Sequence, residues 1–144
     1  MQDLWGFDKL SKHDLKSLPQ GILKEQADLF DNKTDGKLYI RIATRNLTRK
    51  AGDMFGLATN FDIIAPFLDN YSYTLFTMYS MPEKDYPVAI STNSEDFDPI
   101  FSTFEHECDN EASFLKVLKE ILGNQETSNI IKNLYSKSFI DNDY

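Results

Sequence analysis

The sequence contains a single cysteine, Cys108, and therefore cannot form a disulfide within the chain. Its opening residues, "MQDLWGFDKL", lack the basic start and the apolar stretch of a secretory signal. A lone thiol without a secretory signal is typical of proteins kept in a reducing compartment. We therefore expect a cytoplasmic protein.

Long hydrophobic runs are also absent. Runs such as "IIAPFL" at 63–68 extend over a few residues, whereas a membrane-spanning helix needs about 20. Apolar residues still make up 41% of the 144 residues and aromatic residues 13%, which is enough material for a substantial core. We expect one domain over residues 1–144 that does not associate with membranes, with a frayed tail at 137–144.

Motifs that carry well-known chemistry are missing as well. The six glycines form none of the loops that cradle phosphates, and the sequence has no Gly-x-Ser-x-Gly motif. Pairs of carboxylates are easy to find among 23 acidic residues, but in polar loops their pKa values should be too ordinary for a general acid at neutral pH. An enzyme is therefore weakly supported, and we predict no cofactor.

Apolar residues at helical spacing predict three main helices. These cover about residues 19–31, 110–122 and the residues that follow Asn124. Pro19 suits a first helical turn, and Asp109 or Asn110 and Asn124 are favourable caps. The apolar stripe expected for the second helix consists of Phe114, Leu115, Leu118, Ile121 and Leu122.

Alternating apolar and polar residues predict up to five strands. They cover about 37–45, 57–65, 69–81, 86–92 and 100–108, with residues 46–56 as a glycine-containing connection after the first. Consecutive strands with short links favour antiparallel pairing. The sequence thus predicts an α+β fold, in which an antiparallel sheet of four to five strands is covered on one face by an N-terminal helix and two C-terminal helices.

The strand predicted at 69–81 is rich in tyrosine. Strict alternation places Tyr71, Tyr73, Leu75, Thr77 and Tyr79 on one face. Such aromatic rows can stack on bases or sugars, but a nucleic-acid platform also needs basic residues between the rings. We favour the wall of a core or of a protein interface.

All three arginines, Arg41, Arg45 and Arg49, recur at four-residue spacing. On the first predicted strand Arg41 and Arg45 share a face with Tyr39, and Arg49 follows in the connection. Arginine suits bidentate contact with carboxylate or phosphate, so an anion site is one interpretation. The interpretation we favour is a charged sheet face that pairs internally with acids of residues 83–111.

The stretch "FEHECDNE" gathers potential metal ligands. On a strand, His106 and Cys108 point to one face while Glu105 and Glu107 point to the other. A zinc site needs three or four converging ligands, and the second histidine, His13, is remote in sequence, so we predict no metal site. Alternate residues on a strand are also about 6.5–7 Å apart, too far for a thiolate–imidazolium pair.

Negative charge is concentrated between Glu83 and Glu111, where nine acids stand against one base, Lys84. This segment alone has a net charge of −8, equal to that of the whole chain. Such a surface repels nucleic acids and anionic lipids and suits a basic protein. We predict no direct nucleic-acid binding, and a partner-binding surface that includes Glu95, Asp96, Asp98, Glu105 and Glu107.

Three hypotheses about function follow from these features. The first is a protein that acts by binding another protein; one such type is an immunity or antitoxin-like inhibitor that covers a basic effector. The second is an enzyme or binding domain for a small anion, using Arg41, Arg45, Arg49 and Tyr39. The third is a structural homodimer with the tyrosine-rich strand at its interface.

Overall fold

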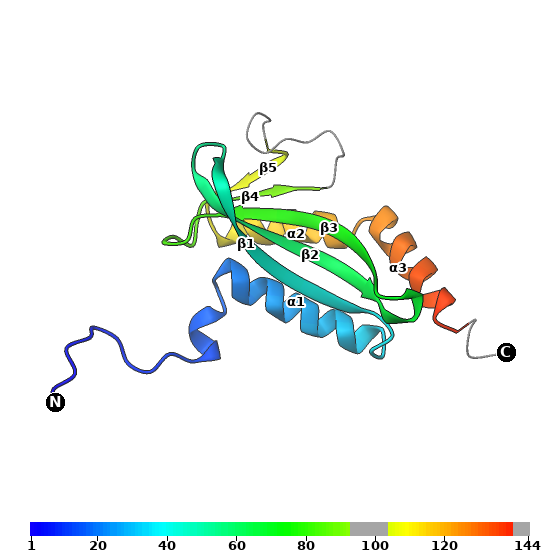
Figure 1. The fold of residues 1–144 in the computed structure, drawn as a ribbon, viewed down its shortest axis with the longest axis horizontal. Helices are drawn as coiled ribbons and strands as arrows, with labels where there is room; N and C mark the ends of the chain where they lie inside the picture. The colour runs from blue at the N-terminus through cyan, green and yellow to red at the C-terminus, as the bar shows by residue number, and fades with distance from the viewer. Residues whose placement is uncertain (93–103, 140–144) are drawn as a thin grey trace.

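The described chain runs through one helix, five strands and two further helices (Figure 1). The structure is a computed structural model, and it describes residues 1–92 and 104–139. The elements are the 3-10 helix η1 (Lys12–Leu15), α1 (Pro19–Lys33), β1 (Tyr39–Ala51), β2 (Phe55–Ala65), the 3-10 turn η2 (Pro66–Leu68), β3 (Tyr71–Ser80), β4 (Val88–Ser91), β5 (His106–Cys108), α2 (Glu111–Leu122) and α3 (Gln125–Lys137). The predicted α+β class is confirmed.

The five strands form one sheet in the order β1-β2-β3-β4-β5, with every neighbouring pair antiparallel. Its centre lies where Phe61 of β2 pairs with Ile42 of β1 on one side and with Phe76 of β3 on the other. The rings of Phe61 and Phe76 stack with their centroids 4.8 Å apart. Short links join β1 to β2 and β2 to β3, as expected for antiparallel neighbours.

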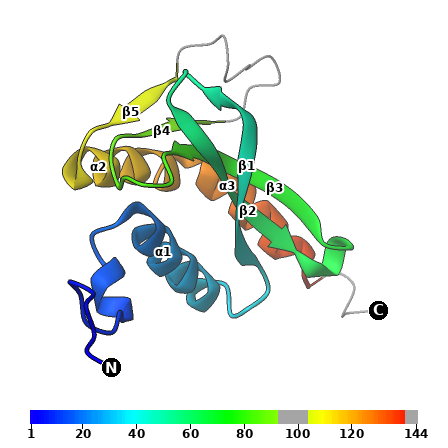
Figure 2. The same cartoon turned by 60° about the vertical axis from the view of Figure 1, so that its left-hand side comes forward.

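All three α-helices pack on the same face of this sheet (Figure 2). Ile22 and Leu23 of α1, Phe114 of α2 and Leu134 of α3 belong to one buried cluster with Phe61 and the other core residues of the strands. Fully burying side chains of this size contributes roughly 1.5–3 kcal/mol each. The face that the helices cover is therefore the main hydrophobic core.

The helices begin where the capping residues predict. The side chain of Asn110 accepts a hydrogen bond from the backbone N–H of Ser113 at 2.9 Å, and Asn124 accepts one from Thr127 at 2.8 Å. These bonds satisfy donors that the first turn of a helix leaves free. The expected stripe of α2 is wrong at Leu115, which is 44% exposed, because α2 turns only part of its apolar surface to the sheet.

The hairpin between β1 and β2 is longer than the sequence predicts. Residues 46–51 belong to β1, so the prediction that Arg49 lies in a connection is wrong. The turn is tight because Gly52 and Asp53 both have positive φ, 59° and 60°, as in a type I′ turn, and the backbone N–H of Met54 donates to the carbonyl of Ala51 at 3.2 Å. Residues 46–51 have the polar composition of a loop, but in this hairpin the positive φ angles of a turn occur at Gly52 and Asp53.

A bulge in β3 changes which tyrosines share a face. Phe61 pairs with Phe76, but the next residue of β2, Asp62, pairs with Thr74, so Leu75 is an extra residue. The alternation therefore shifts by one, and Tyr73 packs with the main core while Tyr79 lies on the opposite face. The prediction of a single row of tyrosines is wrong for this reason.

A second, smaller cluster lies on the face opposite the helices. It contains Ala51, Phe55, Ala58, Tyr79, Ala89 and Phe104. The ring of Phe104 lies 5.6 Å from that of Phe55 and 5.1 Å from that of Tyr79, measured between centroids. This cluster brings the residue just before β5 against the β1–β2 hairpin.

Two predictions fall partly outside the described residues. The fifth strand is His106–Cys108 and so is shorter than the predicted 100–108, of which residues 100–103 are not described. Of the predicted tail at 137–144, Lys137 ends α3 and the ring of Phe139 lies 5.1 Å from that of Tyr135, while 140–144 are not described. Within residues 1–92 and 104–139, no helix combines the length and the apolar character needed to cross a membrane.

Replacing Gly52 with alanine is expected to destabilise the fold more than the same change at Gly36. Both glycines have positive φ, 59° and 72°, which costs an alanine about 1–2 kcal/mol. A Cβ at Gly52 would also lie 2.9 Å from the ring of Phe104, whereas a Cβ at Gly36 would meet nothing within 4 Å. Urea unfolding of the two variants should show the greater loss for Gly52→Ala; equal losses would mean that the Phe104 ring moves aside freely.

Candidate functional site on the polar face of the sheet

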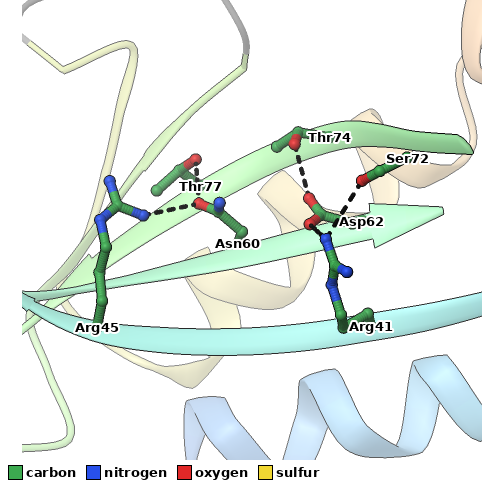
Figure 3. A network of polar contacts seen from close by, with 7 residues as sticks. All are labelled: Arg41, Arg45, Asn60, Asp62, Ser72, Thr74 and Thr77. Atoms are coloured by element: carbon green, nitrogen blue, oxygen red, sulfur yellow. Dashed lines mark hydrogen bonds and ion pairs between the residues drawn. The ribbon is translucent and has the colours of Figure 1, made fainter. Parts of the chain in front are cut away.

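The face opposite the helices carries a row of polar side chains from β1, β2 and β3 (Figure 3). Strand pairing places them side by side, since Asp62 lies opposite Arg41 on one side and Thr74 on the other. Asn60 likewise lies opposite Thr77. On β1 and β2 these side chains share a face because they occupy alternate positions, and on β3 the bulge at Leu75 keeps Thr74 and Thr77 on that face although they are three residues apart.

Arg41 and Asp62 form an ion pair at the centre of this row. The guanidinium Nη2 lies 3.1 Å from Oδ2 of Asp62, and the Thr74 hydroxyl donates to the other carboxylate oxygen at 2.7 Å. The same nitrogen lies 3.4 Å from the Ser72 hydroxyl. The Asp62 side chain is only 4% exposed whereas that of Arg41 is 53% exposed. Arg41 therefore neutralises a buried carboxylate that would otherwise be costly to fold away from water.

Arg45 makes a weaker contact one step along the sheet. Its Nη1 donates to Oδ1 of Asn60 at 3.4 Å, and that oxygen also accepts from the Thr77 hydroxyl at 3.0 Å. Burial raises the pKa of the neighbouring Tyr79, and the charge of Arg45 offsets part of that rise. Arg45 thus contacts a neutral amide, whereas Arg41 contacts a carboxylate.

The structure therefore brings two of the predicted arginines against the next strand. The partner of Arg41 is Asp62, so the expectation that Arg41 pairs with an acid of residues 83–111 is wrong. Tyr39 lies two residues before Arg41 on the same strand and is partly exposed, and Arg49 lies near the end of β1. A signal for the missed partner does exist in "TNFDIIA", where asparagine and aspartate interrupt an apolar strand at alternate positions.

A second polar region lies at the β5 end of the sheet, around Tyr86. The pKa of Tyr86 is raised to about 12 by burial first and then by the charges of Glu111 and Asp85. These two acids are 26 residues apart in sequence, yet both act on one phenol. The Tyr86 hydroxyl donates to the backbone carbonyl of Ser17 at 3.3 Å, and its ring lies edge-on to Phe114.

We call the described acids of residues 83–111 the acidic edge. They are all exposed, and they comprise Glu83, Asp85, Glu105, Glu107, Asp109 and Glu111. The carboxylate of Glu105 accepts a hydrogen bond from the Thr92 hydroxyl. Three further predicted residues, Glu95, Asp96 and Asp98, lie outside the described part of the chain.

His106 and Cys108 lie two residues apart on β5, on the same face of that strand. Cys108 is fully buried, and burial raises the pKa of its thiol, with the charge of Asp109 adding to the rise and a hydrogen bond from Ser113 opposing it. A raised pKa keeps the sulfur in its unreactive thiol form. Across residues 1–92 and 104–139, no three potential metal ligands of the His, Cys, Asp and Glu types come together.

Cys108 should resist thiol-modifying reagents in the folded protein. At pH 8 we expect labelling at least about a hundredfold slower than in denaturant, because reaction requires both opening of the core and loss of the thiol proton. The raised pKa also predicts that stability falls as pH rises past the ordinary range of a thiol, since the unfolded chain then binds fewer protons than the folded one. An exposed thiol introduced by Ser136→Cys in a Cys108→Ser background supplies the control; equal labelling rates would contradict the burial.

Truncating Arg41 should destabilise the protein more than truncating Arg45. We expect Arg41→Ala to lower the free energy of unfolding by about 1–3 kcal/mol, since it leaves the buried Asp62 carboxylate with a hydroxyl donor alone. Arg45→Ala removes a single surface contact and should cost less than about 1 kcal/mol. Denaturant unfolding measures both.

The double variant Arg41→Ala/Asp62→Ala supplies the control for this comparison. Its loss should be smaller than the sum of the two single losses, because it removes both partners of the pair. Additive losses would show that Arg41 and Asp62 do not stabilise each other.

Known protein families, characterised proteins and solved structures were each compared with this chain, and none of them matches it. No site or activity is therefore transferred to this chain from another protein. Proposals about its function rest on the chemistry of its own surfaces.

Proposed function

We propose that this protein acts by binding another protein, and that the acidic edge receives a basic surface of that partner. The observation that carries the proposal is the antiparallel pairing of Val88 with Cys108, which places Asp85, before β4, near Glu111, after β5; both acids also act on Tyr86. Two segments that are separated in sequence thereby form one negatively charged surface. Charge of one sign gathered on one side of a protein steers an oppositely charged partner toward it.

The position of β5 supports the same proposal. In the described part of the chain β5 pairs with β4 alone, so it lies at an edge of the sheet. Its three residues include Glu107, which is exposed and projects to the face opposite Cys108. Asp109 and Glu111 follow directly at the start of α2, so exposed acids continue from the strand into the helix.

An inhibitor of immunity or antitoxin type, which covers a basic effector, is one form of this function. The proposal of an anion site at the arginines has less support. Arg41 already contacts Asp62, and Arg45 already contacts Asn60, so an anion would compete with these contacts. The thiol of Cys108 is buried and kept protonated, which also makes a nucleophilic enzyme at β5 a weaker candidate.

Neutralising the acidic edge should slow association with the partner. The variant carries Glu83→Gln, Asp85→Asn and Glu107→Gln, all at exposed positions that cap no helix. The partner is first captured from the source organism by the immobilised chain, identified and purified. We expect the association rate at low salt to fall at least about threefold, and the difference to shrink as salt screens the charges.

A control variant changes the net charge equally but elsewhere, through Glu25→Gln, Asp31→Asn and Glu120→Gln on the exposed sides of α1 and α2. It should associate at nearly the rate of the unchanged chain. Equal slowing by both variants would mean that only net charge matters. A partner that binds the acidic-edge variant at an unchanged rate in low salt would overturn the proposal.

A further inference from the structure

The first eleven residues form an apolar arm that does not pack against the rest of the chain. Leu4, Trp5, Phe7 and Leu10 are all exposed, and Trp5 is 76% exposed. The arm's contacts are local: the rings of Trp5 and Phe7 lie 5.8 Å apart, and the backbone N–H of Trp5 donates to Asp3. Large apolar side chains clustered in the open mark a surface that is covered in the working protein.

A groove on the helical side of the sheet has the complementary character. Its deeper part is a cavity of about 210 Å³ between α1 and the α2–α3 pair, with Phe61 and Leu75 of the sheet among its lining residues. A second hollow of about 390 Å³ continues along α2, and both are lined by Gln26 and Leu122. An apolar cavity of about 150 Å³ is large enough for a benzene ring, so this groove can accept an aromatic side chain.

Each part of the groove has a lysine at its rim. Lys33 lines the deeper part and Lys119 lines the shallower part. In the arm, Asp3 and Asp8 stand on either side of the aromatic pair. Lys9 follows Asp8 directly and offsets part of the negative charge of the arm, so the match between arm and groove is chiefly apolar, with Asp3 and Asp8 as the side chains that suit the two lysines.

The course of the arm favours a groove on another molecule. The carboxylate of Asp14 accepts from the backbone N–H of Ser11 at 2.8 Å, which fixes the base of the arm at η1. From there the arm extends beyond the N-terminal end of α1, away from the C-terminal end of that helix (Figure 1). The deeper part of the groove lies beside the later half of α1, at Gln26, Leu29, Phe30 and Lys33.

We propose that the arm of one copy, with Trp5 as its anchor, lies in the groove between α1 and the α2–α3 pair of a second copy, and that two copies exchange arms to form a symmetric dimer. A two-fold arrangement repeats the contact, since each copy supplies one arm and one groove. The exchange covers the exposed aromatic rings and fills the groove at the same time. None of the acids of the acidic edge lines the groove.

Trp5 is the only tryptophan, so its fluorescence reports directly on the arm. In the purified chain, sedimentation equilibrium should show a monomer becoming a dimer as concentration rises. The tryptophan emission should shift to shorter wavelength over the same concentration range, because the indole leaves water. A chain that stays monomeric with a solvent-exposed tryptophan would overturn the proposal. A shifted emission in a chain that stays monomeric would also overturn it, because the arm would then occupy the groove of its own chain.

Two variants test the two halves of the contact. Trp5→Ala with Phe7→Ala removes the anchor, and Leu29→Glu places a negative charge at the rim of the groove, where Leu29 is half exposed. Each should weaken dimerisation at least about tenfold, since buried aromatic anchors dominate binding energy. Leu68→Glu, at a comparably exposed leucine outside the groove, should leave the dimer unchanged.

Mixing the two variants gives the sharpest result. The Leu29→Glu chain keeps an intact arm, and the arm variant keeps an intact groove, so the mixture can form one arm–groove contact that neither can form alone. We expect heterodimers in the mixture at concentrations where each variant by itself is monomeric. Failure of the mixture to associate would reject arm exchange, and so would variants that each dimerise as tightly as the unchanged chain. Neither result would affect the proposal for the acidic edge.

Discussion

The fold depends on the difference between the two faces of the interior strand β2, which is greatest at Phe61 and Asp62. Phe61 stacks on Phe76 beneath the helices, while the next side chain points the other way and is neutralised by Arg41. The bulge at Leu75 of β3 lies between the partners of these two residues, so Phe61 pairs with Phe76 and Asp62 pairs with Thr74. One face can then bury apolar helices while the other holds a buried charge, and neither arrangement interrupts the pairing of the strands.

The sequence predicts the parts of this fold that depend on local chemistry. Helix starts at Asn110 and Asn124 follow from side chains that cap the backbone a few residues away, and the α+β class follows from the order of helical and alternating segments. The bulge at Leu75 could not be predicted, because one extra residue in a strand leaves the local pattern of apolar residues almost unchanged. Asp62 as the partner of Arg41 depends on the register of two strands, which no pattern within either strand specifies.

The charged surfaces, too, are predicted in part by the local sequence and in part determined by the pairing of strands. The excess of acids at 83–111 is visible in composition alone, but the pairing of β4 with β5 brings the segments beside these strands together around Tyr86. The opposite edge strand, β1, carries Arg41, Arg45, Arg49 and Lys50 and no acid. Positive and negative charge are thus separated across the sheet, although the net charge of the chain suggests only an acidic protein.

The contact between Gly52 and Phe104 has a consequence for self-association through backbone pairing. Gly52 lies in the hairpin that begins from the edge strand β1, and Phe104 lies just before the edge strand β5, so the two borders of the sheet meet at this end. The sheet therefore curves so that its two edges approach each other at the hairpin. Amyloid-type stacking needs a long, flat border that a foreign strand can follow from end to end. At the hairpin end of the sheet this border stops at the packed ring of Phe104, so a foreign strand that pairs with β1 cannot continue past that point.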